Sequence, residues 1–384
     1  MLLQLTDEQR QLQSMLRRVA DERVAPRAAD IDRTAEYPQD MFELLKELGL
    51  FGLPIRQEFG GADSLVSACL AVEELGRVCY NTAYLLVVQW SAFGGIQAAA
   101  SPEQKERLLP GIACGDIRAS ISVTEPQSGS DVAGILTRAE KVEGGYRLYG
   151  AKAYCTNSTV ADVFIIAAKT DPSKRHAGIS AFIMDRDTPG FTIGKPENKL
   201  GARGIPSCPL YFDGAFVPEE NLMGGEGAGF RAIMDAFNHG RPIMGARGVG
   251  LAQGAMELAA RFVEERRAFG QKVADFQGVQ WMIADMAIQI EAARGLVYKA
   301  ATLADRGVVG RDLSMAAAIA KTFATDTAMK VATDAVQLWG SAGISKDNPV
   351  ERYFRDAKVL QIIEGTNQIQ RNLIGRWTLH DLTR

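Results

Sequence analysis

Val163-Phe164-Ile165-Ile166 and Ile179-Ser180-Ala181-Phe182-Ile183 decide the fold of this chain. Together with Tyr146-Arg147-Leu148-Tyr149-Gly150 and Leu210-Tyr211-Phe212 they form a series of short apolar runs bounded by Gly, Pro and Asp. Such runs are typical of strands that end in turns. Because no helical pattern separates them, they favour a β-barrel or β-sandwich over a doubly wound sheet. We therefore predict a middle β domain over residues 119–228.

The chain on both sides of this region carries a helical pattern. Before it, Met41, Leu44, Leu45 and Leu48 recur at helical spacing, which predicts an N-terminal helical domain over residues 1–118. After it, long helical patterns predict a four-helix bundle in a domain of residues 229–384. These patterns cover residues 244–267, 277–306, 311–340 and 350–372. The predicted fold class is α+β, with a helical, a β and a helical domain in that order.

The composition is that of an ordinary globular protein. Of 384 residues, 47% are hydrophobic and 23% charged, and the net charge of -3 gives no basic field for nucleic acid. The most apolar stretch, residues 84–93, is shorter than the roughly 20 residues that a membrane-spanning helix needs. The start, residues 1–8, lacks the pattern of a signal or transit peptide. We therefore expect a cytoplasmic protein with no nucleic-acid partner and no membrane span.

Cysteine and histidine usage argues against disulfides and metals. The five cysteines form no CxxC pair, and an odd number without a secretion signal predicts reduced, mostly buried thiols. His176, His239 and His380 are far apart in the sequence, which leaves little for a zinc site or a Ser-His-Asp triad. We expect no metal ion.

The loop Val123-Thr124-Glu125-Pro126-Gln127-Ser128-Gly129-Ser130-Asp131 concentrates hydroxyl groups and backbone amides where the first helical region meets the strands. Such a loop can hold a planar heterocycle by backbone hydrogen bonds. On these residues alone, a capping turn in which Ser130 or Asp131 satisfies backbone donors explains it as well.

This loop resembles the TEPxxGSD signature of the acyl-CoA dehydrogenase family. Tyr154-Cys155-Thr156-Asn157 follows at the family's spacing and is similar to its Trp-Ile-Thr-Asn strand. The resemblance continues over essentially the whole chain, through Lys199-Leu200-Gly201, residues 237–254, Arg266-Arg267-Ala268-Phe269-Gly270, Gln337-Leu338-Trp339-Gly340 and residues 363–371. It implies an FAD-dependent oxidoreductase that introduces an α,β double bond into an acyl-CoA thioester. It also implies a homotetramer, built as a dimer of dimers, with an electron-transfer flavoprotein as electron acceptor.

The resemblance implies that Glu364, in Ile362-Ile363-Glu364-Gly365-Thr366, is the catalytic base. It would remove the substrate's α-proton while the β-hydride passes to FAD, and its backbone amide would bind the thioester carbonyl. This chemistry needs a base and an electrophilic pocket, because the α-proton of a thioester is only weakly acidic. The apolar residues before Glu364 are expected to raise its pKa. Without the resemblance, a glutamate before a glycine could equally be a solvent-exposed helix end.

Some family members place the base elsewhere, directly before the arginine that matches Arg241. In this chain that position is Gly240, which has no side chain to accept a proton. The family pattern therefore points to Glu364 again.

The resemblance carries further roles over to single residues. Contact with FAD is implied for Ile121, Val123, Thr124, Gly129, Ser130, Tyr154, Cys155, Thr156, Arg266, Ala268, Phe269, Phe276, Gln277, Gln337, Leu338, Gly340, Ser341, Thr366 and Gln368. Contact with the substrate is implied for Ser130, Asn238, Arg241, Gly365 and Arg376. Arg266 resembles the arginine that binds the FAD pyrophosphate of a neighbouring subunit, although by itself it reads as a solvated member of a charged run.

The glycines Gly248, Gly250 and Gly254 have GxGxxxG spacing in helical surroundings. A dinucleotide fingerprint has GxGxxG spacing between a strand and a helix. We therefore interpret these glycines as sites of close helix packing.

Three residues depart from the family pattern: Tyr154 replaces a tryptophan, Asn238 an aspartate and Ile363 a frequent tyrosine. They leave the acyl group open, whether straight, branched, cyclic, aromatic or bound to a carrier protein. Two alternatives of the same fold also remain open at this point. One is an oxygen-using acyl-CoA oxidase or monooxygenase, and the other is a non-redox protein that binds acyl-CoA or acts as a lyase.

Overall fold

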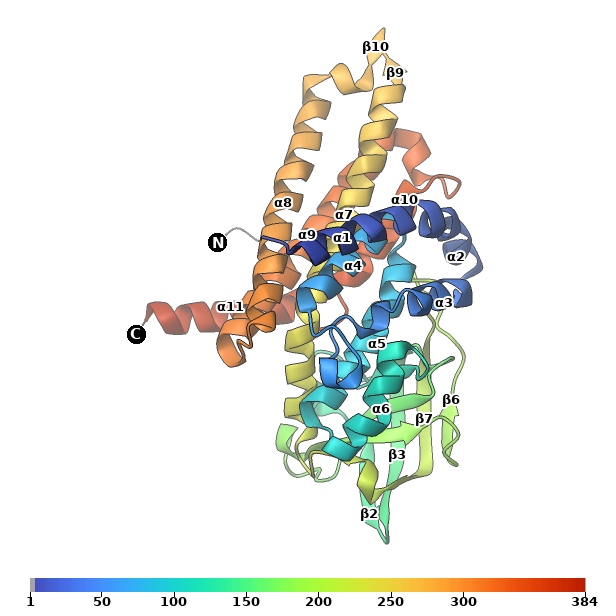
Figure 1. Cartoon of the computed structure of the whole chain (residues 1–384), viewed down its shortest axis with the longest axis vertical. Helices are drawn as coiled ribbons and strands as arrows, with labels where there is room; N and C mark the ends of the chain where they lie inside the picture. The colour runs from blue at the N-terminus through green and yellow to red at the C-terminus, as the bar shows by residue number, and fades with distance from the viewer. Residues whose placement is uncertain (1–3, 384) are drawn as a thin grey trace.

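A computed structural model describes residues 4–383 and shows helices, then a sheet, then helices (Figure 1). The predicted α+β fold class is confirmed. Residues 1–3, part of the start that lacks a signal-peptide pattern, lie outside the described residues, as does residue 384 at the end of the third predicted domain.

Six α-helices form the N-terminal region. Thr6 and Ser101 each close a capping box at the start of a helix, and Pro102 occupies the first turn, where its missing N–H costs nothing. Most of the fifth helix is buried, consistent with its apolar sequence on all sides. The helices are α1 (Asp7–Val19), α2 (Ala28–Thr34), α3 (Gln39–Glu47), α4 (Leu65–Val78), α5 (Tyr80–Ala99) and α6 (Pro102–Cys114).

The middle region forms one eight-stranded mixed sheet in the order β6-β7-β3-β2-β4-β5-β8, with β1 paired in parallel to β4. All four strands expected from the sequence are present, within β3, β4, β5 and β7. Helix α5 lies against the sheet, because a Cβ at Gly95 would be 3.6 Å from Ile121 of β1. The strands are β1 (Ala119–Ser122), β2 (Arg138–Val142), β3 (Gly145–Thr156), β4 (Val163–Lys169), β5 (Ile179–Asp185), β6 (Phe191–Ile193), β7 (Ser207–Pro218) and β8 (Leu222–Met223).

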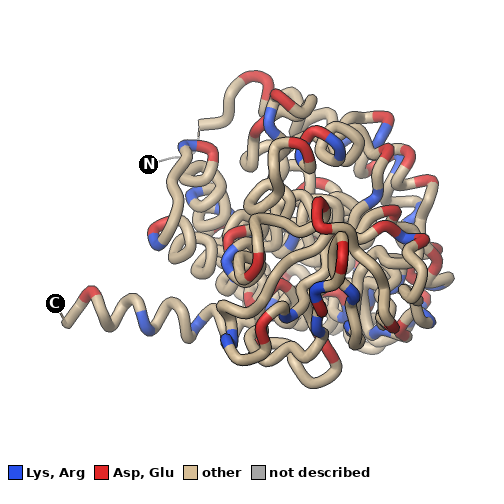
Figure 2. The backbone as a smooth tube through the Cα atoms, turned by 90° about the horizontal axis from the view of Figure 1, so that it is seen from below, with Lys and Arg blue, Asp and Glu red and all other residues tan. Residues whose placement is uncertain are grey.

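The C-terminal region consists of long helices that rise away from the sheet (Figure 1). Helices α7 and α8 are joined at their far end by a small hairpin, and α11 projects away from the body of the molecule (Figures 1 and 2). The elements are α7 (Gly229–Glu265), β9 (Arg267–Ala268), β10 (Gln271–Lys272), α8 (Gln277–Asp305), α9 (Gly310–Trp339), α10 (Val350–Leu360) and α11 (Asn367–Leu382).

Two helix boundaries differ from the sequence prediction. Helix α7 begins at Gly229 rather than near residue 244 and continues through Pro242, because packing against α4 and α5 outweighs the hydrogen bond that proline removes. The helix predicted over 350–372 is two helices, because Glu364 and Gly365 adopt left-handed backbone angles, φ 57° and 85°, between them.

The glycine series packs α7 tightly against its neighbours, as predicted. A Cβ at Gly250 would lie 2.2 Å from the carbonyl oxygen of Glu73, and one at Gly254 would lie 1.8 Å from that of Arg77. Both distances are shorter than any real contact, so only glycine allows α7 to approach α4 this closely.

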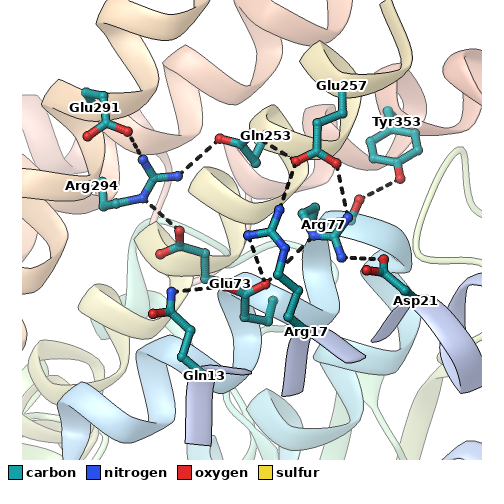
Figure 3. Close-up of polar contacts among 11 residues, drawn as sticks. Gln13, Arg17, Asp21, Glu73, Arg77, Gln253, Glu257, Glu291, Arg294 and Tyr353 are labelled. Atoms are coloured by element: carbon teal, nitrogen blue, oxygen red, sulfur yellow. Dashed lines mark hydrogen bonds and ion pairs between the residues drawn. The ribbon is translucent and has the colours of Figure 1, made fainter. Parts of the chain in front are cut away.

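A buried polar network ties the N-terminal helices to the bundle (Figure 3). The guanidinium of Arg77 pairs with Asp21 and, at 3.0 Å, with Glu257 of α7, and the Arg77 carbonyl accepts a hydrogen bond of 2.6 Å from Tyr353. Nearby, Arg294 of α8 pairs with Glu73 of α4 at 2.8 Å. Since a buried charge is costly without a partner, these pairs hold the two helical regions in one arrangement.

Charges of both signs are interspersed along the backbone, without a face of one sign in the view of Figure 2. Within residues 4–383, no helix combines the length and the apolar character needed to cross a membrane. The five cysteines are unpaired; four are buried and Cys114 is exposed.

Candidate active site

Glu364 lies in the turn between α10 and α11, and the turn is strained. Glu364 has a φ of 57° and Gly365 one of 85°, and a left-handed conformation costs a non-glycine residue about 1–2 kcal/mol. The next residue, Thr366, caps α11 by accepting a hydrogen bond of 3.3 Å from the amide of Ile369. Strain of this kind persists only where the surroundings hold the backbone in place.

Lys321 of α9 holds the turn. Its fully buried Nζ donates hydrogen bonds to the Gly365 carbonyl at 2.9 Å and to Asn367 Oδ1 at 2.8 Å. Asn367 in turn donates to Thr325 Oγ1 at 2.9 Å. Burial lowers the pKa of Lys321 to about 7, against the effect of the Glu364 charge, which raises it. A charged group this deep needs both acceptors, so the lysine fixes the position of the turn.

The Glu364 carboxylate points between α5 and α7. Its Oε1 accepts a hydrogen bond of 3.1 Å from Ser91 of α5, and its Oε2 lies 3.9 Å from where a Cβ of Gly240 would be. Burial raises the pKa of Glu364, while the Ser91 hydrogen bond and the charges of Arg247, Arg241 and Lys321 oppose that shift. The result is a carboxylate of increased basicity in a cationic environment.

Arg241 and Asn238, both expected to contact the substrate, lie together on α7. Arg241 Nη1 donates to Asn238 Oδ1 at 2.6 Å, while its buried Nε has no protein partner. A Cβ at Gly365 would be 3.9 Å from Arg241 Nη2. The structure therefore brings Asn238, Arg241, Glu364 and Gly365 together. Ser130 is exposed on the loop above the sheet, and Arg376 is exposed on α11.

A buried ion pair organises the loop of residues 123–131. Glu125 and Lys152 meet at 2.7 Å, and the carboxylate also accepts hydrogen bonds from the amides of Leu136 (2.6 Å) and Thr137 (3.0 Å). Burial would raise the pKa of Glu125, but Lys152 and the amides hold it below the usual range. Burial lowers the pKa of Lys152 to about 8. The buried Glu125–Lys152 pair thus anchors the loop to the sheet. Thr124, Gly129 and Ser130 remain at least partly exposed to solvent.

The end of β3 offers a surface for a flat ring beside this loop. Tyr154 has a φ of 55° and a side chain that is 63% exposed, and nothing lies within 4 Å of a Cβ placed on Gly129. Thr156 presents a half-buried hydroxyl, 3.3 Å from Ser207 Oγ. The Cys155 side chain points into the sheet, 3.1 Å from Ser120, so only its backbone can face a ligand. Ile121 and Val123 are half-buried nearby. An exposed aromatic face beside open hydroxyl and amide groups fits an isoalloxazine ring.

A second group of expected FAD residues lies at the far end of the bundle. The β9–β10 hairpin carries Phe269, whose side chain is 95% exposed. Phe276 lies edge-on to it at 6.1 Å between ring centroids. Trp339 at the end of α9 stacks on Phe262 of α7 at 4.4 Å, so the end of α9 meets the base of the hairpin. This group comprises Arg266, Ala268, Phe269, Phe276, Gln277, Gln337, Leu338, Gly340 and Ser341.

The hairpin group lies at one end of the molecule and the sheet at the other (Figure 1), and Thr156 at the end of β3 lies beside Tyr84 of α5. Thr366 and the exposed Gln368 belong to neither group of expected FAD residues, because they lie at the start of α11.

Sequence reasoning missed Ser91, Lys321 and Arg247. A lysine within the Ala-rich run of α9 and an arginine among the glycines of α7 were the available signals, since charged residues on apolar helix faces need partners. Ser91 gave no such signal, because a serine fits a helix interior without strain. In the described part of the chain, no cluster of His, Cys, Asp or Glu is arranged to hold a metal ion.

Comparison with known proteins defines the class. Models of the acyl-CoA dehydrogenase N-terminal, middle and C-terminal domains match residues 6–116, 120–215 and 227–379. The acyl-CoA dehydrogenase of Bacillus subtilis is 43% identical over 380 residues, covering 98% of this chain and 99% of that protein.

Solved structures agree with this assignment. A chain in the structure of the electron transferring flavoprotein of Acidaminococcus fermentans matches with a TM-score of 0.96 and 39% identity, over 99% of this chain and 100% of that one. Butyryl-CoA dehydrogenase from Megasphaera elsdenii matches with a TM-score of 0.95 and 37% identity, over the same shares of the two chains.

The chain belongs to the acyl-CoA dehydrogenase family. It is an FAD-dependent enzyme that dehydrogenates an acyl-CoA thioester. The comparisons favour this activity over the oxygen-using and the non-redox alternatives.

Proposed function

We propose that Glu364 is the base of this acyl-CoA dehydrogenase and that its Oε2 takes the substrate's α-proton. Oε1 is occupied by the Ser91 hydroxyl, whereas Oε2 faces the space left by the absent side chain of Gly240. We place the α-carbon of the acyl group in this space. The orientation of the carboxylate toward Gly240 is the observation that carries the proposal.

The chain's own groups support each part of this step. Burial makes Glu364 a stronger base, and the charges of Arg247, Arg241 and Lys321 keep its ionised form accessible. Lys321 fixes the Gly365 carbonyl, so the backbone amide of Glu364 is held ready to donate to the thioester oxygen. FAD, when bound, supplies the acceptor for the hydride from the β-carbon.

The FAD site is completed by a second copy of the chain. Thr124, Ser130, Tyr154 and Thr156 would hold the ring end of FAD, and the hairpin group around Arg266 and Phe269 would hold the FAD of a neighbouring subunit. The exposure of Phe269 and the place of the β9–β10 hairpin, at the end of the molecule away from the sheet (Figure 1), support this arrangement. We extend the proposal to a homotetramer built as a dimer of dimers.

Three further assignments belong to the same proposal. The chain divides at residues 1–118, 119–228 and 229–384, close to the start of β1 at Ala119 and of α7 at Gly229. An electron-transfer flavoprotein reoxidises the enzyme, in line with the likeness to a chain from such a structure. A cytoplasmic location stays a prediction.

The role of Glu364 is tested by reducing the enzyme-bound FAD anaerobically with a panel of acyl-CoA thioesters. The rate is measured as the loss of flavin absorbance. Glu364→Gln is expected to retain FAD and bind acyl-CoA but to lose reduction rate by on the order of 10²–10⁴. Glu47→Gln, an exposed site at the end of α3, is the matched control. Flavin reduction at the wild-type rate in Glu364→Gln would overturn the assignment.

A further inference from the structure

Arg247 of α7 is a fully buried cation with incomplete partners. Its Nη2 approaches the thioether of Met244 at 3.2 Å and the side chain of Tyr84 lies beside it, while its Nε and Nη1 have no hydrogen-bond partner. A buried charge without hydrogen-bond acceptors is costly. Glu364 supplies an opposite charge nearby, but Nε and Nη1 have no acceptor within hydrogen-bond distance, so the position can take a further acceptor.

Two tyrosines of α5 enclose this guanidinium. The rings of Tyr80 and Tyr84 lie 4.4 and 4.0 Å from it, which stabilises a cation through the ring faces. A ring face leaves the in-plane N–H groups without acceptors, and the buried Tyr80 hydroxyl also has no partner. Arg247 and Tyr80 thus present several unused donors in one place.

The spacing along α5 and α7 relates these donors to the catalytic base. Ser91 and Gly240 flank the Glu364 carboxylate, while Tyr84 and Arg247 contact each other. Tyr84 precedes Ser91 by seven residues and Arg247 follows Gly240 by seven, so the two helices run antiparallel. Seven residues span about 10 Å of helix. The backbones of Gly240 and Arg247 are thus two helical turns apart on this interface, and the Arg247 guanidinium is near enough for its charge to lower the pKa of Glu364.

We propose that the acyl group carries a carboxylate at the end remote from the thioester and that Arg247 binds it. This inference rests on the proposed role of Glu364, because it uses the base to define where the α-carbon lies. The substrate class is a dicarboxylic acyl-CoA, with the thioester at the Glu364 end of the α5–α7 interface and the free carboxylate between Arg247 and Tyr80.

A carboxylate suits this position better than an alkyl chain. Its two oxygens match the guanidinium fork, and Tyr80 can donate a further hydrogen bond. An alkyl chain would leave the N–H groups unpaired. When Glu364 takes the α-proton it loses its charge, so a substrate carboxylate would keep Arg247 balanced during the reaction.

The test compares dicarboxylic acyl-CoAs with straight-chain acyl-CoAs of equal carbon number: glutaryl- with pentanoyl-CoA, adipoyl- with hexanoyl-CoA, and pimeloyl- with heptanoyl-CoA. The wild-type enzyme is expected to show at least ~10-fold higher kcat/KM for the dicarboxylic member of the best pair, as a charged hydrogen bond allows. Arg247→Met should abolish this preference, mainly through KM, and Arg247→Lys should retain part of it. Arg231→Met, at an exposed position of α7, should leave the ratio unchanged.

Equal or higher wild-type kcat/KM for the straight-chain member of every pair overturns the proposal, as does an unchanged ratio in Arg247→Met. If Arg247→Met does not fold, the wild-type ratios and Arg247→Lys decide. Failure of the base assignment is separate, since it shows as wild-type flavin reduction in Glu364→Gln whatever the substrate ratio.

Discussion

Two turns in this molecule share a backbone conformation but not an environment. Glu364-Gly365 and Phe269-Gly270 each place a non-glycine residue and a glycine at positive φ, 57° and 85° in one case and 52° and 82° in the other. The first turn lies under Lys321 and Arg241, whereas the second is a bare hairpin tip. Similar local strain is thus held by tertiary contacts in one turn and by a two-strand ladder in the other.

The difference shows what each turn can do. The Glu364-Gly365 turn, called the catalytic turn after the role proposed for Glu364, is surrounded by buried charges, so its position and the pKa of its carboxylate are both set by neighbours. The hairpin tip presents an aromatic ring with almost its whole surface free. A buried turn suits proton transfer at a fixed point, and an exposed one suits contact with another molecule.

Among the variants that compare the two turns, Lys321→Met is expected to have the largest effect on kcat. The substitution removes both hydrogen bonds that hold the catalytic turn, and a displacement of about 1 Å can cost ~10²-fold in rate. We expect kcat to fall by this order with FAD retained and KM little changed, measured by steady-state kinetics. Lys299→Met on the exposed side of α8 is the control. A wild-type kcat in Lys321→Met would remove the positioning role.

The pH dependence of the catalytic turn is the next effect. Burial raises the pKa of Glu364, so kcat/KM should fall about tenfold per pH unit below that pKa, as a required base becomes protonated. The groups facing the carboxylate are Ser91, Tyr80 and Tyr84 of α5, Arg241 and Arg247 of α7, and Lys321.

Removing one of these cations should shift the dependence of kcat/KM on pH. Lys321 lowers the pKa of Glu364, so Lys321→Met should move the acidic limb of kcat/KM to higher pH. A limb that stays in place, or moves to lower pH, would contradict the electrostatic account of the site.

The paired substitutions Gly365→Ala and Gly270→Ala compare the turns directly. Both glycines have positive φ, so each alanine should cost about 1 kcal/mol in backbone strain. A Cβ at Gly365 would also lie 2.6 Å from Gln370 Nε2, whereas nothing lies within 4 Å at Gly270. In urea unfolding, Gly365→Ala should therefore be the more destabilising, and it alone should lower kcat. Equal losses would mean that backbone strain alone sets the cost at both turns and that the Gln370 contact adds nothing.

The smallest effect on folding is expected from Phe269→Ala. A side chain that is 95% exposed contributes little to the stability of its own chain. If it contacts the FAD of a neighbour, its loss should weaken FAD binding by roughly 2- to 13-fold, as expected for one aromatic contact. FAD release measured by fluorescence checks this, with Tyr211→Ala on the sheet as control. An unchanged FAD affinity would leave the hairpin without the proposed role.

Much of the fold could be predicted because it rests on local patterns. The strands within β3, β4, β5 and β7 follow from short apolar runs, and the close approach of α7 to α4 follows from its glycines. The break at Glu364-Gly365 was missed because helical periodicity continues on both sides of it. The start of α7 was missed because Pro242 looks like a boundary when its packing is unknown.

The sequence by itself determined the order of helical, β and helical regions and, through its resemblance to the family motif, pointed to Glu364 as the proposed base. Only the tertiary structure decided which distant residues surround it: Ser91 from α5, Arg241 and Arg247 from α7, and Lys321 from α9. The physical reason is that periodicity and turn residues act over a few positions, whereas a buried charge is balanced by whatever the packed helices bring within reach. The sequence could propose Glu364 as a base, but it could not give the electrostatic environment of that carboxylate.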